Sequence, residues 1–339
     1  MNCDCSDCSA RYLCGGCNPH CRFRHCDGHC DHCAAICGRR HDLSTRLQEV
    51  NGLELDMPLS PQPQGIPLPH FIPQLIAPPD MPVMLDRESI IGIGISLVFT
   101  PKGFISNRVG GEDGHGVRWE WWLSERPRLL LLGNTQDPLL ESLWAVMPEM
   151  RLFGTARTIN FDLATSLNFS LYVERPRLEH LYNVKRTWLT ISQLQRETPN
   201  LVPIPHLQWF REDELKRQIS LLKEEGFHTI TINLQTVREK WIWQRILRGL
   251  ETVKDQYPEV RPIFTGVSSL KTMARLRQIF PWCCFCNSVC QYLAQRHIRL
   301  RREGMRLVRE TVTGNPSVVM SHSIAVYKQF LQELSRSAR

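Results

Sequence analysis

Cysteines concentrate at the start of the chain, at spacings typical of metal ligands. Seven cysteines and four histidines fall between Cys14 and Cys37. Two thiolates two or three residues apart can bind one ion from a single tight turn. The segment has few aliphatic residues, so burial alone cannot fold it and ligation must supply the folding free energy. The predicted ligands are Cys5, Cys8, Cys14, Cys17, Cys21, Cys26, Cys30, Cys33 and Cys37.

Two kinds of metal centre fit these spacings. Thiolates together with nearby histidines suit tetrahedral Zn²⁺. Cys26, Cys30, Cys33 and Cys37 also approach the compact spacing that holds an iron–sulfur cluster, and the first three match the radical-SAM spacing. A radical-SAM motif should follow the first strand of a barrel, whereas this one precedes every expected strand. We therefore predict zinc, with a 4Fe–4S cluster as the alternative.

Composition limits the class of protein. The chain has 339 residues, 42% of them hydrophobic, which allows one large domain with or without a small one. We see no apolar run long enough to span a membrane and no apolar core of a signal peptide, so we expect a cytoplasmic protein. Thiols stay reduced in that compartment, which favours metal ligation over disulfides. The net charge of +7 permits a DNA or RNA partner without requiring one.

The chain divides into four expected parts. Residues 1–41 form the metal-binding module, and residues 42–87 contain a short helix and a proline-rich stretch. Nine prolines fall between Pro58 and Pro82, which predicts an extended linker or a strap laid on the next domain. We expect the main domain over residues 88–325 and a helix end with a basic tail over 326–339.

The main domain alternates short apolar runs with amphipathic helical patterns. We expect strands at 90–99, 128–133, 157–161 and 168–172, and further ones from residues 201, 228, 261, 281 and 316 onward. Such alternation indicates an α/β fold whose parallel sheet is buried on both faces. The number of units favours a TIM-like barrel. The alternative is an open doubly wound sheet, but no glycine-rich dinucleotide fingerprint is present.

Polar side chains follow the expected strands, where a barrel places its chemistry. They are rich in amides and hydroxyls and poor in carboxylates, which argues against metal-dependent hydrolases and glycosidases. We expect the side chains that leave neighbouring strands to converge on a cleft that takes a nucleobase, with Trp209 stacking on it. The candidates are Asp162, Asn168, Ser170, His206, Gln208, Trp209, Asn233, Gln235 and Ser268. None of them is identified as catalytic.

Two further stretches have both a structural and a functional interpretation. Residues 295–310 carry six arginines and are expected to form a helix, either a solvated one or one that tracks phosphates. The phosphate-contacting candidates are Arg296, Arg299, Arg301, Arg302 and Arg306. Cys283, Cys284, Cys286 and Cys290 are expected to be small buried residues. The alternative is that Cys286 and Cys290 face the barrel mouth as thiolates or metal ligands.

Residues 168–301 resemble the bacterial and phage family known as domain of unknown function 4417. The matching residues are Asn168-Phe169-Ser170, Tyr182-Asn183 with Arg186, and Trp209. Family members carry an aspartate where this chain has Asn168. The resemblance implies a TIM-like domain common in mobile elements and brings no known reaction. A weaker similarity is to the barrel of tRNA-guanine and DNA-deazaguanine transglycosylases, which carry a zinc site.

Two functions remain open from the sequence. The first is a metal-binding barrel protein associated with nucleic acid or nucleotides. The second is an iron–sulfur or transglycosylase-like enzyme that acts on a nucleobase.

Overall fold

The computed structural model describes residues 35–38, 40–61, 67–79, 81–86, 89–107, 109, 122–123, 125, 127–150, 152–157, 160–235, 237, 239–304 and 306–337. The predicted ligands from Cys5 to Cys33 lie outside these residues.

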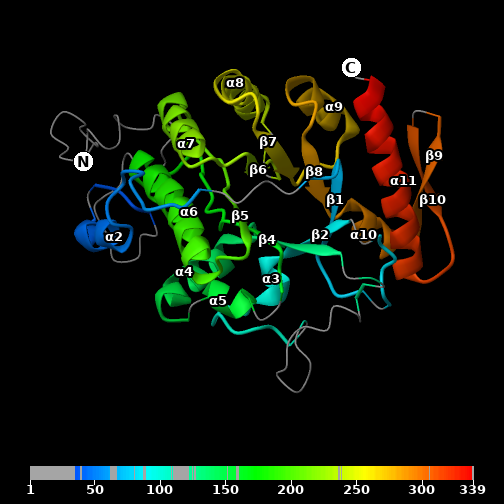
Figure 1. The fold of residues 1–339 in the computed structure, drawn as a ribbon, viewed down its shortest axis with the longest axis horizontal. Helices are drawn as coiled ribbons and strands as arrows, with labels where there is room; N and C mark the ends of the chain where they lie inside the picture. Colours follow the sequence, from blue (N-terminus) through cyan, green and yellow to red (C-terminus); the bar gives the residue numbers. More distant parts are fainter. Residues whose placement is uncertain are drawn as a thin grey trace.

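The core of the molecule is a sheet of eight parallel strands (Figure 1). These strands are β1 (Phe71–Leu75), β2 (Ile90–Gly94), β3 (Arg128–Leu132), β4 (Leu163–Thr165), β5 (Val202–Ile204), β6 (Thr229–Asn233), β7 (Arg261–Thr265) and β8 (Cys284–Asn287). Their order in the sheet is β5-β4-β3-β2-β1-β8-β7-β6. This is the strand order of a TIM-like barrel, so the predicted fold class is confirmed for the barrel.

The two outer strands of this sheet, β5 and β6, meet through a short bridge just past the end of β5. His206 pairs in parallel with Thr231. The N–H of Leu207 donates to the carbonyl of Thr231 at 2.8 Å, and the N–H of Thr231 donates to the carbonyl of Pro205 at 2.8 Å. The sheet is therefore nearly closed, and its carboxyl ends form a ring around one mouth.

Helices cover the outside of the barrel. Those that follow β2 to β7 are α3 (Ile95–Val98), α4 (Asp137–Met150), α5 (Leu152–Arg157), α6 (Arg177–Glu197), α7 (Glu212–Glu224), α8 (Lys240–Gln256) and α9 (Leu270–Ile279). After β8 come α10 (Val289–Ala294), the hairpin β9 (Ile298–Glu303) and β10 (Arg306–Thr311), and α11 (Pro316–Ser337). Helix α2 (Leu43–Glu49) lies at the opposite end of the molecule from α11 and the hairpin (Figure 1).

Side chains alternate between the two faces of the strands. One set points outward and packs with the helices in the largest hydrophobic cluster, which includes Ile91 of β2 and Ile230 of β6. The other set fills the interior of the barrel. It comprises Ile72, Ile90, Leu130, Leu132, Leu163, Ile204, Ile263, Cys284 and Cys286. The barrel is therefore a packed core and not a pore.

The largest correction concerns the proline-rich stretch. We expected a strap outside the main domain, yet Phe71–Leu75 is β1 and pairs with both β2 and β8. Pro73 lacks an N–H and costs the sheet one donor. The remaining residues of β1 are apolar or half-buried, and their burial within the barrel outweighs that loss. The main domain consequently begins before residue 88.

Other segments also differ from expectation. Residues 157–161 and 168–172 contain no strand among their described residues, and the strand between them is Leu163–Thr165. The stretch from residue 316, expected to begin as a strand, belongs to helix α11. The arginine-rich residues form the antiparallel hairpin β9–β10 and not a helix. Glycine supplies the hairpin turn, since Gly304 has a φ of 57°.

In the part of the chain described, none of the helices has the length and apolar character needed to cross a lipid bilayer.

Candidate functional site at the mouth of the barrel

The mouth of the barrel is lined by uncharged polar side chains. Five of them continue the inward alternation of their strand by one step beyond an apolar interior residue, as Asn134 does after Leu130 and Leu132 of β3. The sixth, Asn233, follows Thr229 and Thr231 of β6 in the same alternation. The set, which we call the mouth residues, is Gln74, Asn134, Thr165, His206, Asn233 and Thr265. They come from six different strand ends. In a TIM-like barrel this is the face where ligands bind and chemistry occurs.

His206 is buried, and one of its ring nitrogens has no partner. Its Nδ1 lies 2.9 Å from the backbone carbonyl of Ser166. A carbonyl oxygen only accepts hydrogen bonds, so Nδ1 carries the proton and Nε2 is the free acceptor of a neutral imidazole. Nε2 is buried and makes no hydrogen bond with the described residues. Burial lowers the pKa of His206 to about 4, against the opposing effect of the Ser166 carbonyl.

Asn134 presents a second acceptor without a partner. Its Oδ1 is buried and makes no hydrogen bond with the described part of the chain. An unsatisfied buried polar atom costs about 1–3 kcal/mol, so two at one face need an explanation. Both are acceptors, and a ligand that offers N–H or O–H groups would satisfy them.

Three of the remaining mouth residues, Thr165, Asn233 and Thr265, are held by local hydrogen bonds. The N–H of Gly133 donates to Thr165 Oγ1 at 2.7 Å. Asn233 Oδ1 accepts the N–H of Gln235 at 3.1 Å and lies 3.4 Å from the Thr265 hydroxyl. With its oxygen engaged in this way, the Asn233 amide nitrogen is the part of the side chain left to donate.

Seven predicted cleft residues do not belong to the mouth, and four of them are described first. Asp162 precedes β4 and accepts the N–H of Leu129 at 2.7 Å, so it lies at the amino ends of the strands. Gln208 turns outward and donates to Thr187 of α6 at 2.8 Å. Gln235 and Ser268 follow their strands but are exposed.

Trp209 packs in the core and does not present a stacking face. It is 9% exposed and belongs to the layer between the barrel and the helices. A Cβ at Gly249 of α8 would lie 2.5 Å from Trp209 Cζ2. The indole therefore fills the space that only glycine leaves open on this helix, and the expected stacking role at the mouth is wrong.

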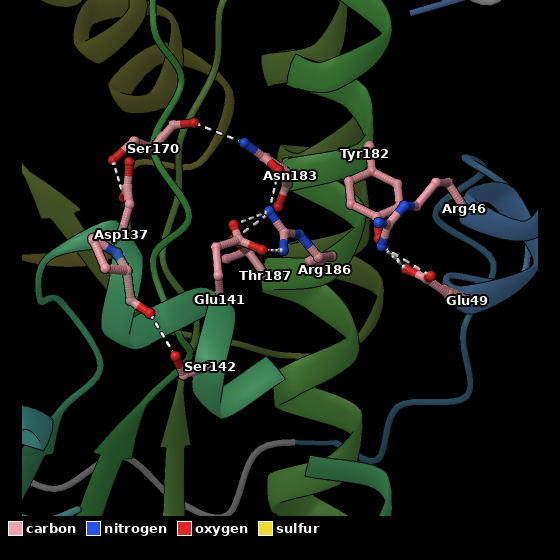
Figure 2. Close-up of polar contacts among 11 residues, drawn as sticks. Arg46, Glu49, Asp137, Glu141, Ser142, Ser170, Tyr182, Asn183, Arg186 and Thr187 are labelled. Atoms are coloured by element: carbon pink, nitrogen blue, oxygen red, sulfur yellow. Dashed lines mark hydrogen bonds and ion pairs between the residues drawn. The ribbon is translucent and has the colours of Figure 1, made fainter. Parts of the chain in front are cut away.

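Asn168 and Ser170 lie in the loop after β4, next to the start of α4. The N–H of Asn168 donates to the carbonyl of Gly133 at 3.1 Å. The Ser170 hydroxyl donates to Asp137 at 2.7 Å, and Asn183 Nδ2 donates to the Ser170 carbonyl at 2.8 Å (Figure 2). Ser170 is thus tied to α4 and α6. Of the predicted cleft residues, only His206 and Asn233 line the mouth.

The residues that carried the family resemblance form a buried network on α6. Arg186 makes a two-bonded contact with Glu141, at 2.7 and 2.8 Å, and donates to Asn183 Oδ1 at 2.6 Å (Figure 2). Its guanidinium also lies 3.9 Å from the ring centroid of Phe169 and 4.9 Å from that of Tyr182. The network fixes the loop after β4 against α6, which is a structural role.

The arginines expected to contact phosphates lie on or beside the β9–β10 hairpin. Three of them form ion pairs, Arg299 with Glu310 at 2.7 Å, Arg302 with Glu333, and Arg301 with Glu303. Arg296 lies 3.7 Å from the ring centroid of Tyr292. Arg306 is exposed. Much of the positive charge is therefore neutralised within the protein.

The cysteines of β8 and α10 are buried thiols. Cys283, Cys284, Cys286 and Cys290 are all fully or almost fully buried. Burial raises the pKa of each, which keeps them protonated at neutral pH. Among the described residues, no group of three or more His, Cys, Asp or Glu could hold a metal ion. Cys37 is the one predicted ligand within the described residues, and the metal module stays a prediction.

Four mouth residues were not among the predicted site residues. They are Gln74, Asn134, Thr165 and Thr265. Asn134, Thr165 and Thr265 could have been found from alternation along their strands, because each stands two positions beyond an interior residue. Gln74 could not be found in this way, because the prolines around it disfavour a strand.

Comparison with known proteins adds little. No known family matches the sequence, and no curated protein does. A solved structure described as a 4-hydroxy-2-oxoglutarate aldolase/2-deydro-3-deoxyphosphogluconate aldolase from TTHB1 is similar to this chain, with 13% sequence identity. The alignment covers 77% of this chain and 94% of the other. The TM-score is 0.33, which is too low to support any argument about activity.

Proposed function

We propose that the barrel mouth binds a small uncharged molecule rich in hydrogen-bond donors, of the nucleobase or nucleoside class. The observation that carries this proposal is a pair of buried acceptors, His206 Nε2 and Asn134 Oδ1, that have no partner among the described residues. The N–H groups of a base edge would satisfy them. The amides of Gln74 and Asn233 can serve the alternating donors and acceptors of the same edge.

The chemistry of the mouth favours a neutral ligand. The mouth residues carry no charge, and His206 stays neutral because burial lowers its pKa to about 4. A charged ligand would lose its hydration there without gaining a counter-charge. A neutral imidazole can also accept a proton from a bound N–H, so His206 is the residue best placed to act as a base if the ligand is transformed.

The test is calorimetric titration with a panel of nucleobases and nucleosides. We expect one member to bind and His206→Phe to weaken its binding about 10- to 100-fold, the usual cost of losing a buried hydrogen bond. The matched control is His228→Phe. His228 is exposed and precedes β6, so it lies at the opposite end of the barrel. No binding by the panel, equal losses in both variants, or binding of a sugar in preference to every base would contradict the proposal.

We retain the metal module and the nucleic-acid association as separate proposals. Elemental analysis of the purified full-length chain should find zinc, or iron and sulfide in the alternative. Protein isolated under reducing conditions that contains neither would reject the module. Binding to DNA or RNA that does not weaken with increasing salt, or that is absent at low salt, would reject the association.

A further inference from the structure

Arg245 of α8 has an aromatic environment, and no carboxylate of the described residues pairs with it. Its guanidinium carbon lies 4.6 Å from the ring centroid of Phe210 and 5.5 Å from that of Trp241. Its Nε is buried and makes no hydrogen bond with the described residues. In the part of the chain that the structure describes, Arg245 forms no ion pair.

The rings beside Arg245 are held in place. The N–H of Phe210 donates to Glu214 at 2.9 Å, and Glu214 in turn contacts Arg177. The Phe210 ring also packs against His180, with 4.2 Å between the ring centroids. The indole N–H of Trp241 donates to Glu239. Both rings that face the cation are therefore restrained by contacts with neighbouring residues.

Arg186 is a second arginine that lies over aromatic rings, and its guanidinium binds a carboxylate. It too lies over aromatic rings, those of Phe169, Tyr182 and Trp144. Two nitrogens of its guanidinium donate parallel hydrogen bonds to the carboxylate of Glu141. Arg245 has the aromatic contacts without the carboxylate. Burial lowers the pKa of Arg245, which reflects the cost of desolvating a cation that has no counter-charge.

We propose that Arg245, set against Phe210 and Trp241, binds an oxyanion, namely a phosphate or carboxylate group of a ligand. A guanidinium offers parallel N–H donors in a planar fork that matches the oxygens of both groups. The site is open to solvent, because Arg245 is only partly buried and Trp241 is 39% exposed.

The position of this site gives it a functional context. Phe210 follows β5, and Trp241 lies in the first turn of α8 after β6. The site therefore lies near the carboxyl ends of β5 and β6, where His206 and Asn233 are found. This placement is independent of the ligand proposed for the mouth. The oxyanion site would be present even if the mouth took a different molecule.

The experiment titrates the full-length protein with inorganic phosphate and, separately, malonate at constant ionic strength, following phosphate by ³¹P line broadening and malonate by calorimetry. We expect Arg245→Gln to abolish saturable binding of at least one of these anions, and Arg245→Lys to weaken it about tenfold because a lysine cannot bind through two parallel bonds. The control is Arg248→Gln, an exposed arginine on the same helix. Circular dichroism of each variant establishes that it is folded.

Three outcomes would overturn the proposal. The first is an absence of saturable binding of both anions by the parent protein. The second is unchanged binding by a folded Arg245→Gln. The third is an equal loss in Arg248→Gln, which would indicate general surface charge. If Arg245→Gln does not fold, the Arg245→Lys result decides, because undiminished affinity there contradicts recognition by a two-bonded fork.

Discussion

The two halves of the barrel interior are built from opposite kinds of side chain. Toward the amino ends of the strands the interior is aliphatic and closely packed, with Ile90, Leu130 and Ile263 fully buried. At the carboxyl ends it is polar, and two buried acceptors lack partners. The half toward the amino ends, which we call the lower half, is a buried apolar cluster, whereas the mouth leaves hydrogen-bonding capacity unused among the described residues. Such a contrast is expected where residues are retained for binding at some cost in stability.

The lower half should respond most strongly to truncation. Leu130→Ala removes a fully buried side chain from the centre of the barrel and should lower the free energy of unfolding by about 2–5 kcal/mol. Urea denaturation measures the change. Ile204→Val, which removes one methyl group from the same cluster, is the graded control and should cost only about 0.5–1.5 kcal/mol. A loss below 1 kcal/mol in Leu130→Ala would show that the interior is not tightly packed.

Acid should destabilise the protein through its buried histidines. Burial lowers the pKa of both His206 and His180 to about 4, from 6.5 for a free side chain. Between pH 6.5 and 4 the unfolded chain therefore binds protons that the folded chain does not, and stability falls as the pH falls. The loss approaches about 3 kcal/mol for each histidine. His206→Leu should reduce the acid sensitivity by about half. A stability profile that is flat over this interval would contradict the buried neutral state.

Substitution at the mouth should affect stability least. His206→Leu loses the bond to Ser166 but also removes a buried unpartnered nitrogen, so the free energy of unfolding at pH 7 should change by less than about 1 kcal/mol. Urea denaturation at pH 7 gives the comparison with Leu130→Ala. A destabilisation as large as that of Leu130→Ala would make His206 a structural residue.

Much of the barrel could be predicted because its strands are apolar runs between helical patterns. The strands at 90–94, 128–132, 202–204, 229–233, 261–265 and 284–287 all fall within or beside expected segments. Strand β1 was not predicted because a proline at position 73 disfavours a strand locally. The stabilisation that β1 gains by pairing with β2 and β8 cannot be read from the local sequence. The hairpin was missed because its arginines fit a solvated helix as well as a solvated ribbon.

The site was predicted only in part, for a geometric reason. The candidates were chosen by residue type near the ends of the expected strands and not by parity, although only alternate positions point into a barrel. His206 and Asn233 satisfy the alternation. Gln208 also has the right parity, yet it follows the end of β5, where the chain has turned toward α6. The burial of Trp209 depends on Gly249 of α8, which is distant in the sequence, so no local pattern could predict it.

The central claim is that His206 Nε2 is a neutral acceptor available to a ligand. Two-dimensional ¹⁵N NMR of histidine-labelled protein observes this atom directly, with the signal assigned by its loss in His206→Phe. At pH 7 we expect an unprotonated Nε2 and a protonated Nδ1, and a shift of the Nε2 signal alone when the ligand selected from the base panel is added. An imidazolium at pH 7, a proton on Nε2, or a signal unmoved by a bound ligand would contradict the account.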